Sequence, residues 1–462
     1  MSIDKKKPDT GPADGVNTAA DEAPDLDAVM RKYDRESATR LWEGTPQLII
    51  RILMAAFGLF CIGMTLFSKA MPEIRLTMFV GCIIIIGFLT YPASKHHVRV
   101  NYLPWYDIVL MVVGAACFFY FALNAMTLVR LSTRIETVHV IIGVVGILIL
   151  MELCRRCVGL PILCVAGVLI VYAFINQLSY AGAVNGATLY DALKTIIYKL
   201  FYTTSGVIGT PINVCYTYIV LFIIFGAFLE RTGIANFFIS FANRLAGWSS
   251  GGPAKVAVIS SALCGMVSGS SVGNTVTTGS FTIPMMKKTG YKPEFAGAVE
   301  AVASTGGQFA PPIMGAVGFI MAEFLGVSYT KVMLAAAIPA FLYYLALIMA
   351  VHFEAKKLGL KGLSREYIPD ALVVIRKRGH LIIPLVVLMV VMFMGYTPLF
   401  AAAMAIFATV VASWLSRETR MGPKRILQAL EEGAKGAVGV GVSCVIIGII
   451  IGSVSLTGLG LT

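Results

Sequence analysis

A short polar cluster separates two apolar runs between residues 253 and 288, and neither run is long enough to cross a bilayer, which takes about 20 residues of helix. The first run ends at Val267, and the second ends at Lys287 and Lys288. The pattern predicts a helical hairpin that enters the membrane, turns at mid-depth and leaves on the same side. Non-helical backbone is tolerated at that depth only where protein buries it or where it lines a wet cavity. The hairpin tip is therefore a candidate binding site.

The rest of the chain has the composition of a polytopic membrane protein. Only 13% of its 462 residues are charged, about half of what a soluble protein carries. Apolar segments of about span length recur along the sequence, which predicts an all-α membrane fold. Membrane spans are predicted at 48–68, 76–92, 104–125, 137–153, 160–179, 211–230, 329–353, 380–396, 398–416 and 436–457, with a broken span at 293–325.

The net charge of +12 comes mostly from Lys and Arg in short loops. This pattern follows the positive-inside rule and places the N-terminus in the cytoplasm of a multi-pass inner-membrane protein. Nucleic-acid binding would need a solvated basic face instead, so no nucleic-acid partner is expected.

Three regions are predicted along the chain. Residues 1–46 are polar and read as a disordered cytoplasmic tail. Residues 47–155 form a four-span scaffold, and residues 156–462 form a transport domain whose helices are interrupted by Gly and Pro.

Segments 182–204 and 419–435 are amphipathic and are expected to lie along the membrane surface in contact with lipid. Asp107 and Glu152 stand near the ends of predicted spans, where they are expected to be solvated or to snorkel.

A weak internal repeat is visible. Segment 189–200 precedes the span 214–233, and segment 425–436 precedes the span 441–460; each span ends in Thr-Gly. The topology runs the first of these spans inward and the second outward, which is the pattern of an inverted repeat in secondary transporters.

The hairpin tip offers hydroxyl, amide and carbonyl oxygens, the ligands that a hard cation such as Na⁺ prefers. The second limb begins close to the tip, so its N-terminal N–H groups favour a substrate carboxylate. The alternative is a helix-packing interface of small residues. The predicted cation ligands are Ser268, Ser270, Ser271, Gly273, Asn274, Thr275, Gly306 and Gly307, and the predicted substrate-binding residues are Asn274, Thr277, Thr278, Gln308 and Pro311.

The broken span carries Gly306-Gly307 and Pro311-Pro312, which remove helix propensity and backbone donors. The helix is expected to open near mid-membrane, where its freed carbonyls complete the cation site and Gln308 donates to a carboxylate. A proline kink in a structural helix is the alternative.

Glu300 lies two helical turns inward from Lys292, about 12 Å into the membrane. An intramembrane acid marks function by default. Three roles remain open: neutralising a cation, relaying a proton, or bonding a neighbouring helix.

Four motifs resemble the large, DctM-like membrane subunit of TRAP transporters. They are SGSSVGNT at 268–275, TGSFTIP at 278–284, EFAGAVE at 294–300, and STGGQ at 304–308 followed by Pro311-Pro312. The branch most similar is the fused permeases that work with TAXI-type binding proteins, in which a four-span, DctQ-like small subunit precedes the large one.

The resemblance implies an elevator-type permease of the ion transporter superfamily. Such a permease takes organic acids from an extracytoplasmic TAXI-type solute-binding protein and is driven by Na⁺, or by H⁺, as coupling ion, with no other cofactor. Family members continue with a second hairpin after the position of Thr462. The expectation is a C-terminally truncated chain with an incomplete second repeat.

Three other functions compete with this one. The first is a carboxylate symporter that needs no binding protein, against which the four N-terminal spans argue. The second is an inactive truncated remnant. The third is a membrane-embedded enzyme, which would need a membrane-depth His/Asp or Ser/His constellation that the sequence does not offer; no P-loop or nucleophile-elbow motif is present either, so an enzyme is not expected.

Overall fold

The computed structural model describes residues 39–93, 100–131, 134–185, 189–362, 376 and 378–459. Within these ranges the regular structure is entirely helical. Eight of the described helices are long and apolar enough to cross a membrane, which makes the chain a multi-pass membrane protein. Most of the predicted N-terminal tail, up to residue 38, lies outside the described residues.

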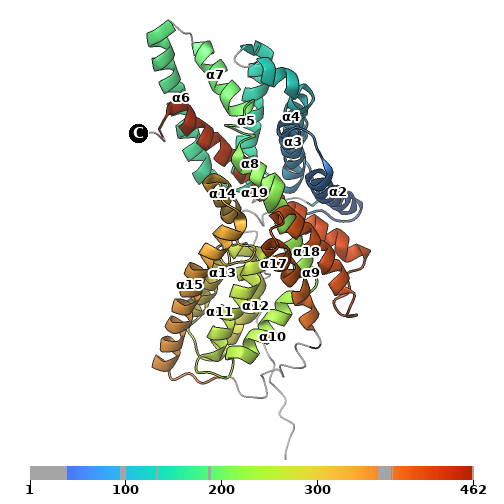
Figure 1. Cartoon of the computed structure of the whole chain (residues 1–462), viewed down its shortest axis with the longest axis vertical. Helices are drawn as coiled ribbons and strands as arrows, with labels where there is room; N and C mark the ends of the chain where they lie inside the picture. Colours follow the sequence, from blue (N-terminus) through green and yellow to red (C-terminus); the bar gives the residue numbers. More distant parts are fainter. Residues whose placement is uncertain are drawn as a thin grey trace, which may run out of the picture.

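The helices form an elongated molecule with the N-terminal helices at one end (Figure 1). Four of them coincide with the first four predicted spans, and α6 and α7 pack beside them. The bounds of these six helices are α2 Thr45–Phe67, α3 Pro72–Thr90, α4 Trp105–Leu131, α5 Thr137–Cys157, α6 Leu160–Asn185 and α7 Leu189–Phe201.

The next span is assembled from three consecutive helical segments. It runs through α8 (Thr210–Val214), the π-helical turn η2 (Cys215–Ile219) and α9 (Val220–Arg231). Gly233 has a left-handed φ of 80° and turns the chain into α10 (Ile234–Ala246). Such a conformation costs glycine little because it has no Cβ.

Helix α19 corrects the prediction that residues 419–435 lie along the membrane surface. It is one continuous helix, Pro423–Thr457, of 35 residues, or about 52 Å at 1.5 Å per residue. Its glycines allow close packing along its length. A Cβ on Gly433 would lie 2.9 Å from the Cα of Ile224, and one on Gly448 would lie 2.4 Å from the carbonyl oxygen of Gly206. Tertiary packing therefore buries one face of this segment, at Ala429, Leu430, Gly433 and Ala434, and keeps it in line with the rest of α19.

The predicted spans 380–396 and 398–416 are shorter in the structure than expected. The 3₁₀ turn η4 (Gly379–Ile382) leads into α17 (Ile383–Phe393), and α18 (Pro398–Ser413) packs beside α17. Gly395 at φ 87° and Pro398 end one helix and start the next. The 16 residues of α18 cover about 24 Å, less than the roughly 30 Å hydrocarbon core.

The other end of the molecule is built from the predicted hairpin and broken span (Figure 1). The limbs of the hairpin are α11 and α12, the halves of the broken span are α13 and α14, and α15 packs against α11, α13 and α14. Their bounds are α11 Gly252–Ser268, α12 Ser271–Lys288, α13 Pro293–Gly306, α14 Ala316–Leu325 and α15 Tyr329–Lys357.

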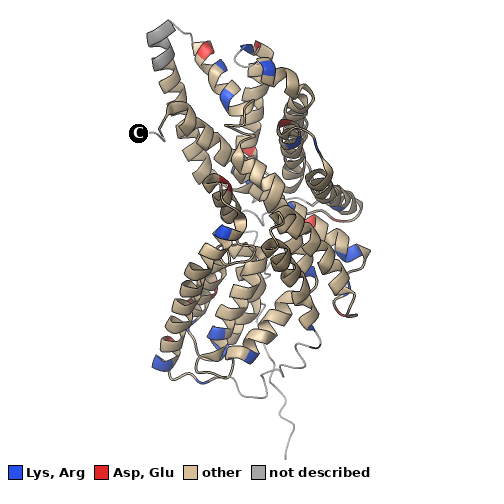
Figure 2. Cartoon of the chain, viewed as in Figure 1, with Lys and Arg blue, Asp and Glu red and all other residues tan. Residues whose placement is uncertain are grey.

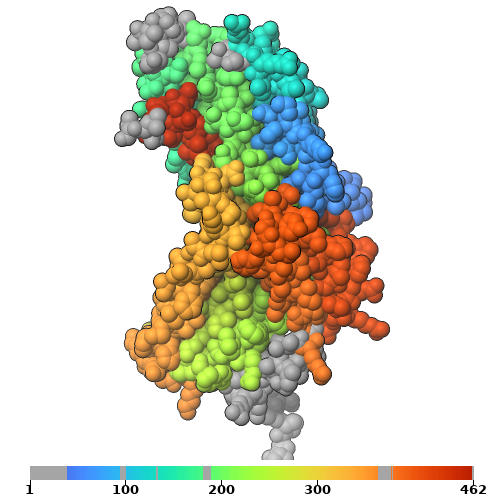
Figure 3. Space-filling view, in the orientation of Figure 1, coloured from blue at the N-terminus to red at the C-terminus, as the bar shows by residue number. Residues whose placement is uncertain are grey.

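Charged residues gather at the ends of the helices, and the helix bodies are almost free of them (Figure 2). In the space-filling view, the N-terminal helices and the hairpin region occupy opposite ends, with α14 and α17 between them (Figure 3). This is the surface expected of a chain that spans a bilayer.

Asp107 is not the solvated residue that the sequence predicts, whereas the Glu152 side chain remains 29% exposed. The Asp107 side chain is fully buried, pairs with Arg156 at 2.7 Å and also pairs with Arg40. Arg156 reaches Glu152 at 2.7 Å and lies over the ring of Phe88, 4.8 Å from its centroid. A buried carboxylate needs such partners. The network fastens the chain around residue 40 to α4 and α5.

Candidate functional site at the hairpin tip

The tip of the hairpin is a two-residue connection between antiparallel helices. Gly269 caps α11 in the left-handed region, with φ 63°. Ser270 is the N-cap of α12, and its Oγ accepts a hydrogen bond of 3.2 Å from the backbone N–H of Gly273. A serine N-cap satisfies one of the orphan donors at a helix start. The predicted helical hairpin and its polar turn are confirmed, and its depth in the membrane stays a prediction.

The broken span opens where the sequence predicts. Helix α13 ends at Gly306 and α14 begins at Ala316, and a cis peptide joins Pro311 and Pro312 in the loop between them. The hydroxyl of Tyr329 lies 3.1 Å from the carbonyl oxygen of Pro312 and 2.5 Å from that of Ile313. Tyr329 therefore provides a donor for a carbonyl that the break frees.

The hairpin and the break meet through glycine backbones. A Cβ added to Gly307 would lie 2.5 Å from the Cα of Gly265, and one added to Gly269 would lie 2.5 Å from the carbonyl oxygen of Met314. The amide of Gln308 donates to the hydroxyl of Ser271 over 3.0 Å. The tip and the loop of the broken helix thus form one structural unit.

This unit forms one wall of a cavity of about 400 Å³. The opposite wall is apolar and comes from η2, α9 and α19, including Phe222 and Val440. The polar side chains at the cavity wall are Ser268, Ser270, Ser271 and Gln308. A largely apolar cavity with a few convergent polar groups is the usual form of a small-molecule site.

The other residues predicted for the site lie around this wall. Asn274 and Thr278 are buried behind it, and Gly306 packs against the ring of Tyr344. Thr275 and Thr277 donate their hydroxyls to backbone carbonyls one turn earlier in α12. Gly273 and Gly307 make the backbone contacts described above, and Pro311 lies in the loop of the break.

Asn274 has one buried oxygen with no partner among the described residues. Its Nδ2 donates to the carbonyl of Ser261 over 2.8 Å, while its Oδ1 is buried and accepts no hydrogen bond. The side chain is only 1% exposed. A buried polar atom without a partner costs about 1–3 kcal/mol of stability. A bound cation would remove this cost, because it accepts the lone pair of Oδ1.

Glu300 is completely buried beside Asn274's helix and is surrounded by hydroxyl groups. Its Oε1 accepts from Ser261 at 2.5 Å, from Ser304 at 3.2 Å and, closer still, from Thr278. Its Oε2 accepts from Thr282 at 2.6 Å. No Lys or Arg within the described ranges forms an ion pair with it.

This cage can satisfy Glu300 in either protonation state. Four hydroxyls donate to an ionised carboxylate. When the carboxyl carries a proton, Thr278 and Thr282 can turn instead to the carbonyl oxygens of Asn274 at 2.8 Å and Thr278 at 3.0 Å.

The sequence reasoning missed the hydroxyls of Ser261, Thr282 and Ser304. The sequence did hold a signal for Thr282 and Ser304. Thr282 stands four residues after Thr278, and Ser304 stands four residues after Glu300, so each pair shares a helix face. Ser261 lies on the other limb of the hairpin, and only the three-dimensional fold brings it to Glu300.

A polytopic helical protein in which a helical hairpin and a broken helix together form the polar wall of a cavity has the features of membrane transporters. The family described as "Tripartite ATP-independent periplasmic transporter, DctM component" matches residues 145–462. The chain belongs to this family.

Curated relatives carry related names. The C4-dicarboxylate TRAP transporter large permease of Pseudomonas aeruginosa is 29% identical over 245 residues, 52% of this chain and 55% of the relative. Its namesake from Vibrio cholerae is 31% identical over 207 residues, 44% of each chain. The sialic acid TRAP transporter large permease of Vibrio cholerae is 29% identical over 144 residues, 31% of this chain and 33% of the relative. The matches span about half or less of these relatives.

Proposed function

We propose that this chain is the membrane permease of a binding-protein-dependent secondary transporter that imports carboxylates with Na⁺ or H⁺. The observation that carries the proposal is the cavity of about 400 Å³ whose polar wall is the hairpin tip and the break. Family membership supports the transporter class, and the names of two relatives support a C4-dicarboxylate as the first substrate to test.

In this proposal the cation binds behind the polar wall of the cavity. The Oδ1 of Asn274 supplies one ligand, and carbonyl oxygens of the tip and of Gly306-Gly307 supply others. Oxygen ligands without a fixed charge suit a monovalent cation. The substrate carboxylate binds in the cavity, close to the start of α12, where Gln308 and the hydroxyls of Ser270 and Ser271 are donors and the helix dipole favours an anion.

The finer family assignment belongs to the same proposal. The four N-terminal helices act as a fused small subunit, and a TAXI-type extracytoplasmic solute-binding protein delivers the substrate. The hairpin, the broken span and α15 move as an elevator against α2–α7 and α19. The protein sits in the inner membrane with its N-terminus in the cytoplasm. A separate core formed by parts of α11, α12 and α13 and by the end of α15 supports such a moving body, while α14 and the start of α15 pack into the main core.

Uptake of labelled succinate into proteoliposomes that contain the full chain tests this function. We expect accumulation only when a Na⁺ or H⁺ gradient and the cognate binding protein are both present. Uptake of free substrate at the same rate without the binding protein would favour the binding-protein-independent symporter instead. No accumulation of any organic acid under any gradient would contradict transport by this chain.

We expect Glu300→Gln to abolish the response of uptake to an imposed pH gradient, because an amide keeps most of the hydrogen bonds of the cage and cannot release a proton. The measurement is uptake at a fixed Na⁺ gradient with and without an inward proton gradient. Glu294→Gln is the matched control, since Glu294 is exposed on the first turn of the same helix. An unchanged response to pH in Glu300→Gln would show that the carboxyl has a structural role.

A further inference from the structure

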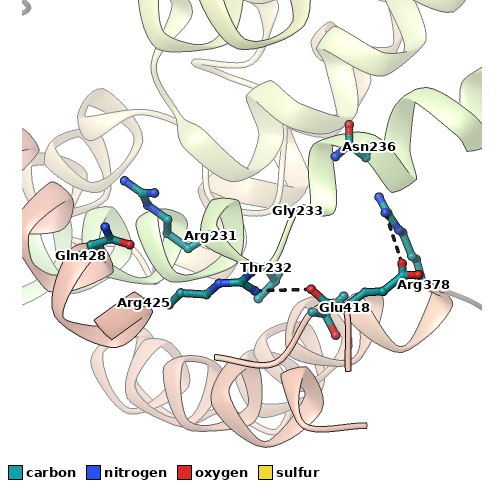
Figure 4. Close-up of a pocket in the computed structure, with 9 residues that line it drawn as sticks. Arg231, Thr232, Gly233, Asn236, Arg378, Glu418, Arg425 and Gln428 are labelled. Carbon is teal, nitrogen blue, oxygen red and sulfur yellow. Dashed lines mark hydrogen bonds and ion pairs between the residues drawn. The ribbon is translucent and has the colours of Figure 1, made fainter. Parts of the chain in front are cut away.

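A second cavity, of about 290 Å³, lies at the start of α10 and is basic. It opens between the Thr232–Gly233 turn, the segment at Arg378 and the start of α19 (Figure 4). Three arginines, Arg231, Arg378 and Arg425, line it, against a single acid, Glu418. The lining therefore carries an excess of positive charge.

Two of the three arginines are only partly neutralised. Arg231 donates to both carboxylate oxygens of Glu432, which neutralises it but does not itself line the cavity. Arg378 reaches Glu418 at 3.5 Å, the long end of an ion pair. Arg425 donates to backbone carbonyls of Glu418 and Arg420, at 3.4 and 3.2 Å. Each guanidinium has further N–H donors available, so the cavity favours an anionic group.

An apolar groove of about 180 Å³ lies next to this cavity, along α10 and the segment that follows Arg378. On α10, the cavity is lined by Asn236 and the groove by Phe237 and Phe241; beyond Arg378, the groove is lined by Ile382 and Leu385. The groove lining therefore begins at the next residue of α10, Phe237, and four residues beyond Arg378, at Ile382. Its exposed lining is almost entirely apolar.

We propose that the two cavities together hold one anionic phospholipid, with its phosphate among the three arginines and an acyl chain in the groove. The cationic pocket suits the phosphate headgroup of a lipid, and the apolar groove beside it suits the acyl chain that is attached to that headgroup. Arginine is the residue best suited to phosphate, because its planar guanidinium can donate two parallel hydrogen bonds.

The bound chain would also contact the transport site. Pro312 of the break and Val267 near the hairpin tip line the same groove. The lipid therefore packs against the broken span at Pro312, whose neighbour Ile313 lines the substrate cavity. This inference goes beyond the proposed transport function and does not depend on the substrate or the coupling ion.

Native mass spectrometry of the full chain in detergent tests the proposal, with phosphatidylglycerol and phosphatidylcholine as the added lipids. We expect one phosphatidylglycerol to be retained in preference to phosphatidylcholine. Arg378→Gln and Arg425→Gln should each weaken retention about tenfold, the value of a hydrogen bond to a charged group. Arg244→Gln should leave it unchanged, because Arg244 is exposed on α10 and lies outside the pocket.

A second pair of variants tests the groove and separates a lipid from free phosphate. Leu385→Trp fills the groove and should weaken retention about tenfold, while Val386→Trp, 51% exposed on the next position, should not. Inorganic phosphate should raise the melting temperature less than phosphatidylglycerol does. If phosphate raises the melting temperature as much as phosphatidylglycerol does, and Leu385→Trp leaves lipid retention unchanged, the cavity binds a free anion and the proposal is overturned. Retention that survives both arginine changes would also overturn it.

Discussion

Replacing Asn274 with alanine is expected to reduce cation-driven uptake by about tenfold to a hundredfold, the range set by losing one polar contact to a charged group. Asn274 is the one predicted ligand whose side-chain oxygen is both buried and without a partner in the described part of the chain. Alanine removes that oxygen and also the bond from Nδ2 to Ser261. The measurement is the initial rate of succinate uptake as a function of Na⁺ concentration and of pH.

Ser280→Ala is the matched control for this prediction. Ser280 lies on the same helix, is exposed, and donates only to the carbonyl of Thr277. Its removal should leave both the rate and the cation dependence unchanged. If Asn274→Ala is made in normal amounts and still shows the wild-type dependence on Na⁺ and on pH, the cation does not bind at Asn274.

Replacing Asp107 with alanine is expected to lower the free energy of unfolding by about 3 kcal/mol, because breaking a buried ion pair leaves a charge without compensation. Arg156 keeps its contact with Glu152, whereas Arg40 is left with the carbonyl of Tyr102. The loss should therefore fall at the lower end of the range for buried pairs. Thermal unfolding in detergent measures it.

The exposed pair of Glu354 with Lys357 provides the comparison. These side chains stand 3.8 Å apart, and Lys357 is 75% exposed. Such a pair contributes about 0–1 kcal/mol, so Glu354→Ala should leave the unfolding midpoint nearly unchanged. Equal midpoints for Asp107→Ala and Glu354→Ala would show that the buried network adds no stability.

The sequence predicted the hairpin and the break because both are marked by local chemistry. Gly269 and Ser270 interrupt an apolar run, and Gly306-Gly307 with Pro311-Pro312 interrupt another. Such residues change backbone preference wherever they occur. The meeting of tip and break required the fold, but the shared polar character of the two segments already indicated it.

The predictions failed where contacts with residues distant in the sequence determine whether a side chain or a helix face is buried. Asp107 stands in the first turn of α4, a position that suits a solvated acid, and nothing local shows that Arg40 and Arg156 converge on it. The amphipathic start of α19 resembles a surface helix until α9 is packed against it. The hydroxyls around Glu300 come from three helices, so a single-helix pattern reveals only part of the cage.

The most direct test of the central claim, that the hairpin tip forms the substrate site, is the protection of a cysteine placed in the cavity. Val272 lines the cavity and is 43% exposed. In a background with the exposed Cys164 replaced by serine, Val272→Cys should react with a maleimide. Na⁺ or acidic pH together with a transported carboxylate should slow this reaction, while Lys288→Cys at the exposed end of the same helix should be unaffected. An unchanged rate at Val272→Cys under every combination of ion and carboxylate would contradict the account.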